Sequence, residues 1–174
     1  LEHLKSIIDK PRAEISKYAP QIEKLMINPD KIGAVIGKGG EMINKITYLH
    51  SLNSVKLASV IDKYREAPLN CFLEVNLTES LSKTGINPDN IISSLAMIKE
   101  FKNINVIGLM TMTEANMNDL EKMEVFTKLK NLKEELNKLG YSNITHLSMG
   151  MSDDYHIAIT CGATFVRLGR ILFS

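Results

Sequence analysis

Two short stretches near the carboxyl end combine small, hydroxylated and charged residues in a pattern suited to binding an anion. They are SMGMSDD, residues 148–154, and VRLGR, residues 166–170. In barrels of parallel strands, the loops after the last two strands commonly hold a phosphate, because unpaired backbone N–H groups point there. The two stretches therefore predict a phosphate site at the carboxyl ends of neighbouring strands.

A third stretch, Gly37-Lys38-Gly39-Gly40, could bind the phosphates of a nucleic acid. Glycines lack a Cβ atom, so backbone N–H groups can approach a sugar-phosphate chain, and Lys38 adds a positive charge. Such a turn between two helices suits single-stranded RNA. A P-loop is excluded, because its second glycine is followed by Lys and then Ser or Thr, where this chain has Gly39. The alternative is a plain turn that needs glycine only for its backbone angles.

Other kinds of site find little support. The histidines His50, His146 and His156 have no carboxylate or cysteine at a metal-ligand spacing, so we expect them to be structural or exposed and predict no metal. Glu74 alternates within a strand, and Asp153 and Asp154 are adjacent, which disfavours acid–base chemistry by two carboxylates. We therefore predict no catalytic residue and do not expect an enzyme.

The elements that must position these residues begin at Tyr48. Short apolar stretches predict strands at 48–52, 71–77, 105–112, 144–151 and 164–173. Apolar residues spaced three and four apart predict helices at 55–65, 88–101 and 118–139, and Gly140 and Gly162 stand where helices should stop. Alternating strands and helices imply an α/β fold with a parallel sheet, outer helices and a site at the carboxyl ends of the strands.

Composition limits the class of protein. A chain of 174 residues with 44% hydrophobic residues can bury one core, and 21 basic against 20 acidic residues create no overall field that would attract nucleic acid or a membrane. Cys71 and Cys161 form no CxxC pair, which fits a reducing cytosol. No apolar run approaches the roughly 20 residues needed to cross a bilayer. We expect a soluble, cytoplasmic protein with no membrane partner.

The segment KPRAEISKYAPQIEKLMINPDKIGAVIGKGGEMINKIT, residues 10–47, resembles the part of bacterial polynucleotide phosphorylase that leads into its KH domain. The resemblance implies that Gly37, Lys38, Gly39 and Gly40 form an RNA-clamping loop. The two further strands and third helix of such a domain do not follow, and the enzyme's catalytic core is absent. We therefore expect residues 1–47 to be a linker and a truncated KH-like βαα segment, with RNA binding as an alternative function. The residue pattern within this segment predicts a strand at 24–28 and helices at 29–36 and 41–47.

From residue 48 to 174 the chain resembles the pyridoxal phosphate homeostasis proteins, which are related to the amino-terminal barrel of alanine racemase. The matching motifs are LHSLNSVKLA, LEVNLTESLSKTGI, IGLMTM, LSMGMSDDYHIAI and GATFVRLGRILF. The resemblance implies a partial (β/α)8 TIM-type barrel of about five βα units that lacks the first three strands. It also implies pyridoxal 5′-phosphate as cofactor.

The same resemblance implies a role for each site residue. Ser148, Met151 and Ser152 would border the phosphate, and Gly169 and Arg170 would offer it backbone groups. Arg167 would approach the pyridine nitrogen and keep it unprotonated, which weakens the cofactor as an electron sink. Asn76 and Met110 would face the mouth of the barrel from strand ends.

Each of these residues also has a purely structural interpretation. Ser152 could cap a helix over 153–160, whose acidic first turn would repel a phosphate. Arg167 could be half of a buried ion pair, and Asn76 and Met110 could simply fill the barrel.

Covalent attachment is a separate question. The family holds its cofactor through a Schiff base to a lysine on an early strand, and the resemblance implies that this chain lacks that strand. Lys83, in ESLSKTG, matches a lysine position in a later loop. It is either a substitute amine or a solvated loop residue, so the cofactor could bind without a covalent bond.

A barrel without three strands has two open edges and an uncovered interior. The segment before residue 48 could imitate a missing βα unit, or two copies could associate into a homo-oligomer. The remaining alternative is an artificial join near residue 47 in a hybrid chain with no evolved activity.

Overall fold

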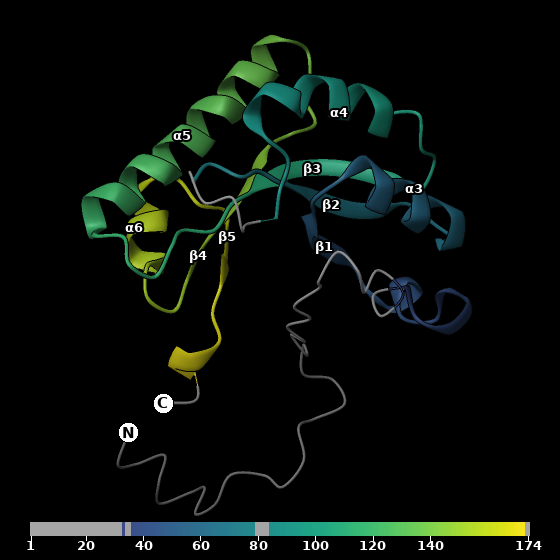
Figure 1. Ribbon diagram of the computed structural model, residues 1–174, viewed down its shortest axis with the longest axis horizontal. Coiled ribbons are helices and arrows are strands. Elements are labelled where there is room, and N and C mark those ends of the chain that lie inside the picture. Colours follow the sequence, from purple (N-terminus) through teal and green to yellow (C-terminus); the bar gives the residue numbers. More distant parts are fainter. Residues whose placement is uncertain (1–32, 34–35, 79–83, 173–174) are drawn as a thin grey trace, which may run out of the picture.

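The computed structural model describes residues 33, 36–78 and 84–172 (Figure 1). Five parallel strands form one sheet in the order β1-β2-β3-β4-β5, so each strand lies beside its neighbour in the chain. The sheet curls into part of a barrel, which confirms the predicted partial (β/α)8 fold; the described residues contribute five strands and four α-helices. The strands are β1 Tyr48–Leu52, β2 Leu69–Glu74, β3 Ile104–Met110, β4 His146–Met151 and β5 Phe165–Arg167.

The helices cover the outer face of the sheet (Figure 1), with α3 in contact with α4 and α5 in contact with α6. They are α3 Val55–Tyr64, α4 Ile91–Ile98, α5 Asp119–Lys138 and α6 Tyr155–Thr160. Polar side chains begin two of them: Ser54 caps α3, and Asn118 forms a capping box with Glu121 in α5. Gly140 and Gly162 have φ angles of 99° and 94°, as the predicted helix stops require. No helix within the described ranges is long and apolar enough to span a membrane.

Two predicted elements end early. The expected strand 164–173 stops at Arg167, and Arg170–Leu172 form a 3-10 turn, because the N–H groups of Gly169 and Ile171 donate to a side chain, Ser152 Oγ. The predicted helix 88–101 begins with a 3-10 turn, Pro88–Asn90, and its regular part ends at Ile98.

The predicted helix over 41–47 is not formed. Short 3-10 turns cover Lys38–Gly40 and Ile43–Lys45 instead. The side chain of Asn44 donates to Tyr64 O at 3.1 Å and accepts from Glu66 N at 3.1 Å, so this stretch is fixed by contacts with the end of α3 rather than by helical bonds. The strand predicted at 24–28 lies outside the described residues, as does most of the helix predicted to follow it.

Buried side chains form two layers, one on each face of the sheet. A continuous apolar cluster lies between the sheet and the helices and also contains Ile36 and Ile43. Side chains on both sides of residue 47 therefore pack together. The domain boundary predicted at this residue stays a prediction. The other layer fills the barrel interior. Strand register sets its order: Phe72, Gly108 and His146 lie side by side, and Glu74, Met110, Ser148 and Phe165 form the next row toward the carboxyl ends.

Candidate functional site

The floor of the candidate site is a cluster of rings inside the barrel. His50 stacks on Phe72 with ring centroids 4.4 Å apart and planes 9° from parallel. Phe165 meets Phe72 edge-on at 5.0 Å and His146 at 5.3 Å. Gly108 leaves the room for this cluster, because a Cβ atom there would lie 2.8 Å from the Phe72 ring. His50 and His146 therefore pack within this ring cluster, and His156 is exposed.

Above this floor, Arg167 extends from the end of β5 into the barrel. Its Nη1 donates to Ser148 Oγ at 2.8 Å and its Nη2 to Thr111 O at 3.0 Å. Both acceptors are uncharged, which differs from the ion pair that sequence allowed as an alternative. Burial lowers the pKa of Arg167, and the carboxyls of Asp154 and Glu74 oppose this effect. The guanidinium remains a cation.

Ser148 connects Arg167 to the floor. Its side chain is completely buried, and its Oγ lies 2.8 Å from Arg167 Nη1 and 2.8 Å from His50 Nδ1. Burial, together with the charge of Arg167, lowers the pKa of His50 to about 4. The imidazole is therefore neutral near neutral pH.

Glu74 provides a buried carboxyl at the end of β2. Only 3% of the residue is exposed, and its Oε1 accepts from Thr84 Oγ1 at 2.6 Å. Burial raises the pKa of Glu74, whereas the Thr84 hydrogen bond and the charge of Arg167 lower it. Because Ile86 N donates to Glu74 O at 2.8 Å, Glu74 also fixes the chain at Ile86.

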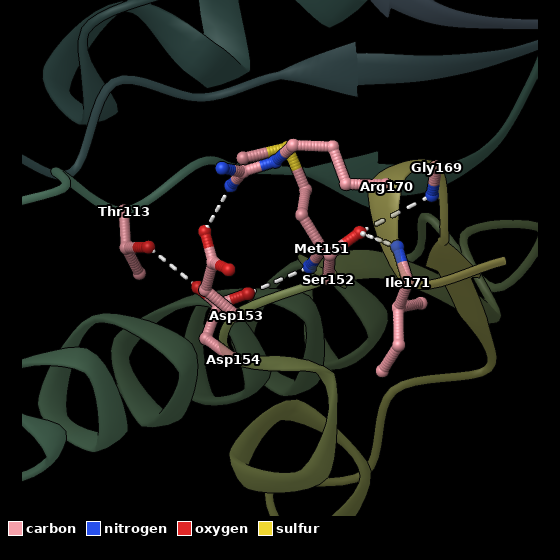
Figure 2. A network of polar contacts seen from close by, with 8 residues as sticks. All are labelled: Thr113, Met151, Ser152, Asp153, Asp154, Gly169, Arg170 and Ile171. Carbon is pink, nitrogen blue, oxygen red and sulfur yellow. Dashed lines mark hydrogen bonds and ion pairs between the residues drawn. The ribbon is translucent and has the colours of Figure 1, made fainter. Parts of the chain in front are cut away.

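A second polar network joins the loops after β3, β4 and β5 (Figure 2). Asp154 is 4% exposed and accepts from Thr113 Oγ1 and from Met151 N, both at 2.6 Å. Gly150 turns the chain here with a φ of 89°, and a Cβ atom on it would lie 2.5 Å from Ala158 Cβ. The close approach of α6 to the end of β4 therefore requires glycine at this position.

The outer part of this network contains Ser152, Gly169 and Arg170, which were predicted to lie beside a phosphate. Ser152 Oγ accepts from Gly169 N at 3.3 Å and from Ile171 N at 3.4 Å, and the exposed side chains of Arg170 and Asp153 form an ion pair. Helix α6 begins at Tyr155, so Ser152 does not cap it, contrary to the structural alternative. Two N–H groups therefore converge on one hydroxyl oxygen.

The remaining predicted residues lie in several places. Asn76 Oδ1 accepts from the N and Oγ1 of Thr78, both at 3.2 Å, and so closes the turn after β2. Met110 ends β3 and is 3% exposed, and Met151 ends β4. Lys83 lies outside the described residues.

The glycine turn before the barrel is shaped by packing. Gly37 and Gly40 have φ angles of 72° and 91°, and Cβ atoms on them would lie 2.8 Å from Met42 N and 3.0 Å from Tyr64 O. Lys38 and Gly39 are exposed. The outer two glycines are thus required by the fold itself, and the inner pair faces solvent.

Sequence reasoning did not select several residues that build the site, namely His50, Glu74, Thr111, Thr113 and Asp154. For Glu74 the available signal was alternation, because Phe72 and Glu74 lie two residues apart on one strand and therefore share its inner face.

Known proteins share this architecture. The family described as "Alanine racemase, N-terminal domain" matches residues 38–174, and the KH domain matches residues 22–47. Two structures of PipY from Synechococcus elongatus PCC7942, without and with PLP bound, have TM-scores of 0.73 and 0.71. Both are 25% identical and share 85% of this chain and 67% of theirs. An alanine racemase of Clostridium difficile, 17% identical with a TM-score of 0.62, supports the fold alone. The half-barrel is thus of the alanine racemase amino-terminal class.

Curated relatives narrow this class. The pyridoxal phosphate homeostasis protein of Synechocystis is 33% identical over 96% of this chain and 80% of its own length. The pyridoxal phosphate homeostasis protein of Helicobacter pylori strain J99 is 40% identical over 74% of this chain and 58% of its own length. The match to the same protein of Aquifex aeolicus covers 59% of the length of that relative. The chain belongs to the pyridoxal phosphate homeostasis family.

Proposed function

We propose that the protein binds pyridoxal 5′-phosphate at the mouth of the half-barrel and takes part in the homeostasis of this cofactor. The observation that carries the proposal is Arg167, a half-buried cation directed into the barrel by two uncharged acceptors. Family membership and the PLP-bound structure of PipY support the choice of ligand.

At the ring end of the site, Arg167 would meet the pyridine nitrogen. A guanidinium has five N–H donors, and Ser148 and Thr111 use two of them, so donors remain for a ligand. Because arginine does not give up its proton, the pyridine nitrogen would stay unprotonated. The bound cofactor supplies an aldehyde and an electron-withdrawing ring, and an unprotonated ring withdraws electrons weakly. Binding and delivery therefore fit the site better than turnover.

At the phosphate end, the turns after β4 and β5 would hold the anion. Gly169 N already donates to an oxygen, Ser152 Oγ, and a phosphate oxygen has the same acceptor character. Arg170 adds a positive charge, although Asp153 pairs with it and opposes an anion. We propose that Met151 borders this end, that Asn76 and Met110 line the mouth, and that Lys83 is the candidate amine for a covalent bond. Ser148, which the resemblance also assigned to the phosphate, is completely buried and holds Arg167 at the ring end instead.

A titration with pyridoxal 5′-phosphate tests this function. We expect a saturable change in the absorbance of the cofactor, and an Arg167→Gln variant should weaken binding at least tenfold, since a charge-assisted hydrogen bond contributes about 1.5–3 kcal/mol. Lys99→Gln, which removes one exposed positive charge, is the matched control and should bind like the unaltered chain. No saturable binding by the unaltered, folded chain would reject the proposal.

The KH match favours a second candidate function, binding of single-stranded RNA by the Gly37–Gly40 turn, to which Lys38 and Gly39 would contribute. Replacing Lys38 and Gly39 by Asp should abolish a gel shift with single-stranded RNA. The exchange leaves Gly37 and Gly40, which the fold requires, in place. Equal shifts with both proteins, or none with either, would remove this candidate.

We further propose that the protein works in the cytoplasm and associates with a second copy. Tyr48 on β1 is 43% exposed, and Ile171 and Leu172 beyond β5 are 41% and 61% exposed, so apolar side chains lie at both edges of the described sheet. Light scattering that gave the mass of a monomer across a wide concentration range would contradict self-association.

A further inference from the structure

Arg167 belongs to a chain of three side chains that crosses the barrel interior. Arg167 Nη1 donates to Ser148 Oγ at 2.8 Å, and the same oxygen lies 2.8 Å from His50 Nδ1. The three residues come from β5, β4 and β1. The curl of the sheet brings β1 and β5 together across the interior, where the rings of His50 and Phe165 are 5.7 Å apart.

The chemistry of the three groups fixes the direction of every hydrogen bond in the chain. A guanidinium can only donate, so Ser148 Oγ accepts from Arg167. The hydroxyl hydrogen of Ser148 then needs an acceptor, because the side chain is completely buried. His50 Nδ1 is the acceptor within reach among the described residues, and it can accept only when unprotonated. The proton of the neutral imidazole is therefore on Nε2.

The position of the His50 ring is fixed independently of this chain. The ring stacks on Phe72 at 4.4 Å and meets the edge of Phe165. The lowered pKa of His50, about 4, agrees with a neutral imidazole that accepts a hydrogen bond beside a cation. A rigid acceptor therefore stands at the inner end of the chain.

We propose that His50 is a positioning residue for the cofactor: its Nδ1 holds the Ser148 hydroxyl so that the serine oxygen faces Arg167 and keeps the guanidinium pointing into the mouth. This inference rests on the proposed function, because the ligand positioned in this way is the pyridine ring. His50 acts through Ser148 and Arg167 and does not itself touch the ring.

Two substitutions separate the acceptor of His50 from its ring. His50→Phe keeps a stacked ring without Nδ1, and His50→Asn keeps an acceptor close to the position of Nδ1 without the ring. We expect His50→Phe to weaken binding of pyridoxal 5′-phosphate about tenfold, and Ser148→Ala by a similar factor, as for loss of one buried hydrogen bond. His50→Asn should retain most of the affinity. The double variant His50→Phe, Ser148→Ala should bind no more weakly than Ser148→Ala alone.

A spectroscopic measurement on the ligand-free protein is independent of cofactor binding. Nitrogen-15 NMR of the histidine rings should identify His50 as neutral at pH 7, with the proton on Nε2, and Ser148→Ala should shift its Nδ1 signal. A proton on Nδ1 would overturn the inference whatever the affinities are.

The outcomes distinguish this inference from the proposed function. If the unaltered chain binds the cofactor and His50→Phe binds equally well, or if the effects of His50→Phe and Ser148→Ala simply add, the role of His50 is rejected and the function stands. If the unaltered chain does not bind, the function and the positioning role both fail. Circular dichroism confirms that each variant is folded, and where His50→Phe is not, strong loss of affinity in His50→Asn overturns the inference.

Discussion

His50 and His146 occupy neighbouring positions in the barrel interior but have different partners. His50 Nδ1 has a hydrogen-bond partner in Ser148, whereas His146 Nδ1 is buried without a partner among the described residues. Both side chains pack against Phe165. Apolar packing therefore decides where these rings lie. Burying Nδ1 costs more free energy in His146, where the atom has no partner among the described residues, than in His50.

The lowered pKa of His50 predicts how stability depends on pH. Between about pH 6.5 and about pH 4, the unfolded chain carries a proton on this imidazole that the folded chain does not. The free energy of unfolding should therefore decrease as the pH falls through this window. Urea denaturation at several pH values checks this, and His50→Phe should have a shallower decrease. Identical slopes in both proteins would contradict the assignment.

Asp154 should be the most important acidic residue of the loop network for stability. Asp154→Ala leaves the half-buried partners Thr113 Oγ1 and Met151 N without their acceptor, which should cost about 2–3 kcal/mol. Asp153→Ala is the matched control, because this neighbouring carboxylate is exposed and pairs only with the exposed Arg170 among the described residues. Equal stability of the two variants in urea denaturation would refute the prediction.

At this scale Arg167 and Ser148 could be selected from the sequence, because both stand in short motifs that resemble those of a known family. It could not predict His50, whose partner Ser148 lies 98 residues away in the chain. The chemistry of His50 arises only when the curl of the sheet brings β1 opposite β5. The positions of Ser148 and Arg167 beside one another are observed, and their roles toward a cofactor stay predictions.

Among the elements, α5 is the helix with the most complete amino-terminal cap. Asn118 Oδ1 accepts from Leu120 N at 2.9 Å and from Glu121 N at 3.1 Å, and Glu121 Oε2 accepts from Asn118 N at 2.7 Å. Asn118→Ala should therefore reduce the free energy of unfolding by about 1 kcal/mol. Thermal unfolding measures this loss. Asn116→Ala, two residues earlier and exposed, is the matched control and should leave the free energy of unfolding nearly unchanged.

The elements that the sequence predicted well are those with local signals. Ser54 and Asn118 begin helices, and Gly140 and Gly162 end them through positive φ angles that glycine adopts without strain. The early end of β5 depends instead on a hydrogen bond from Gly169 to Ser152, 17 residues away. The turns at 38–45 likewise depend on a contact between Asn44 and Tyr64, and no local pattern contains it.

For the whole molecule, a ligand at the mouth should stabilise the fold. The proposed site draws on β2 to β5 and the loops that follow them, so binding the folded state alone shifts the unfolding equilibrium. Pyridoxal 5′-phosphate at 100 times its dissociation constant should add about 2.7 kcal/mol and raise the melting temperature. Pyridoxal, which lacks the phosphate, should produce a smaller shift. An unchanged melting temperature at saturating cofactor would contradict a site in the mouth.

The strand order also bears on how the protein forms during synthesis. Since every strand of the described sheet lies beside the one made just before it, each new βα unit can dock onto an edge that has already left the ribosome. Arg167 is on the last of these strands. A nascent chain can thus assemble β1 to β4 before it contains Arg167, the cation that we propose contacts the cofactor.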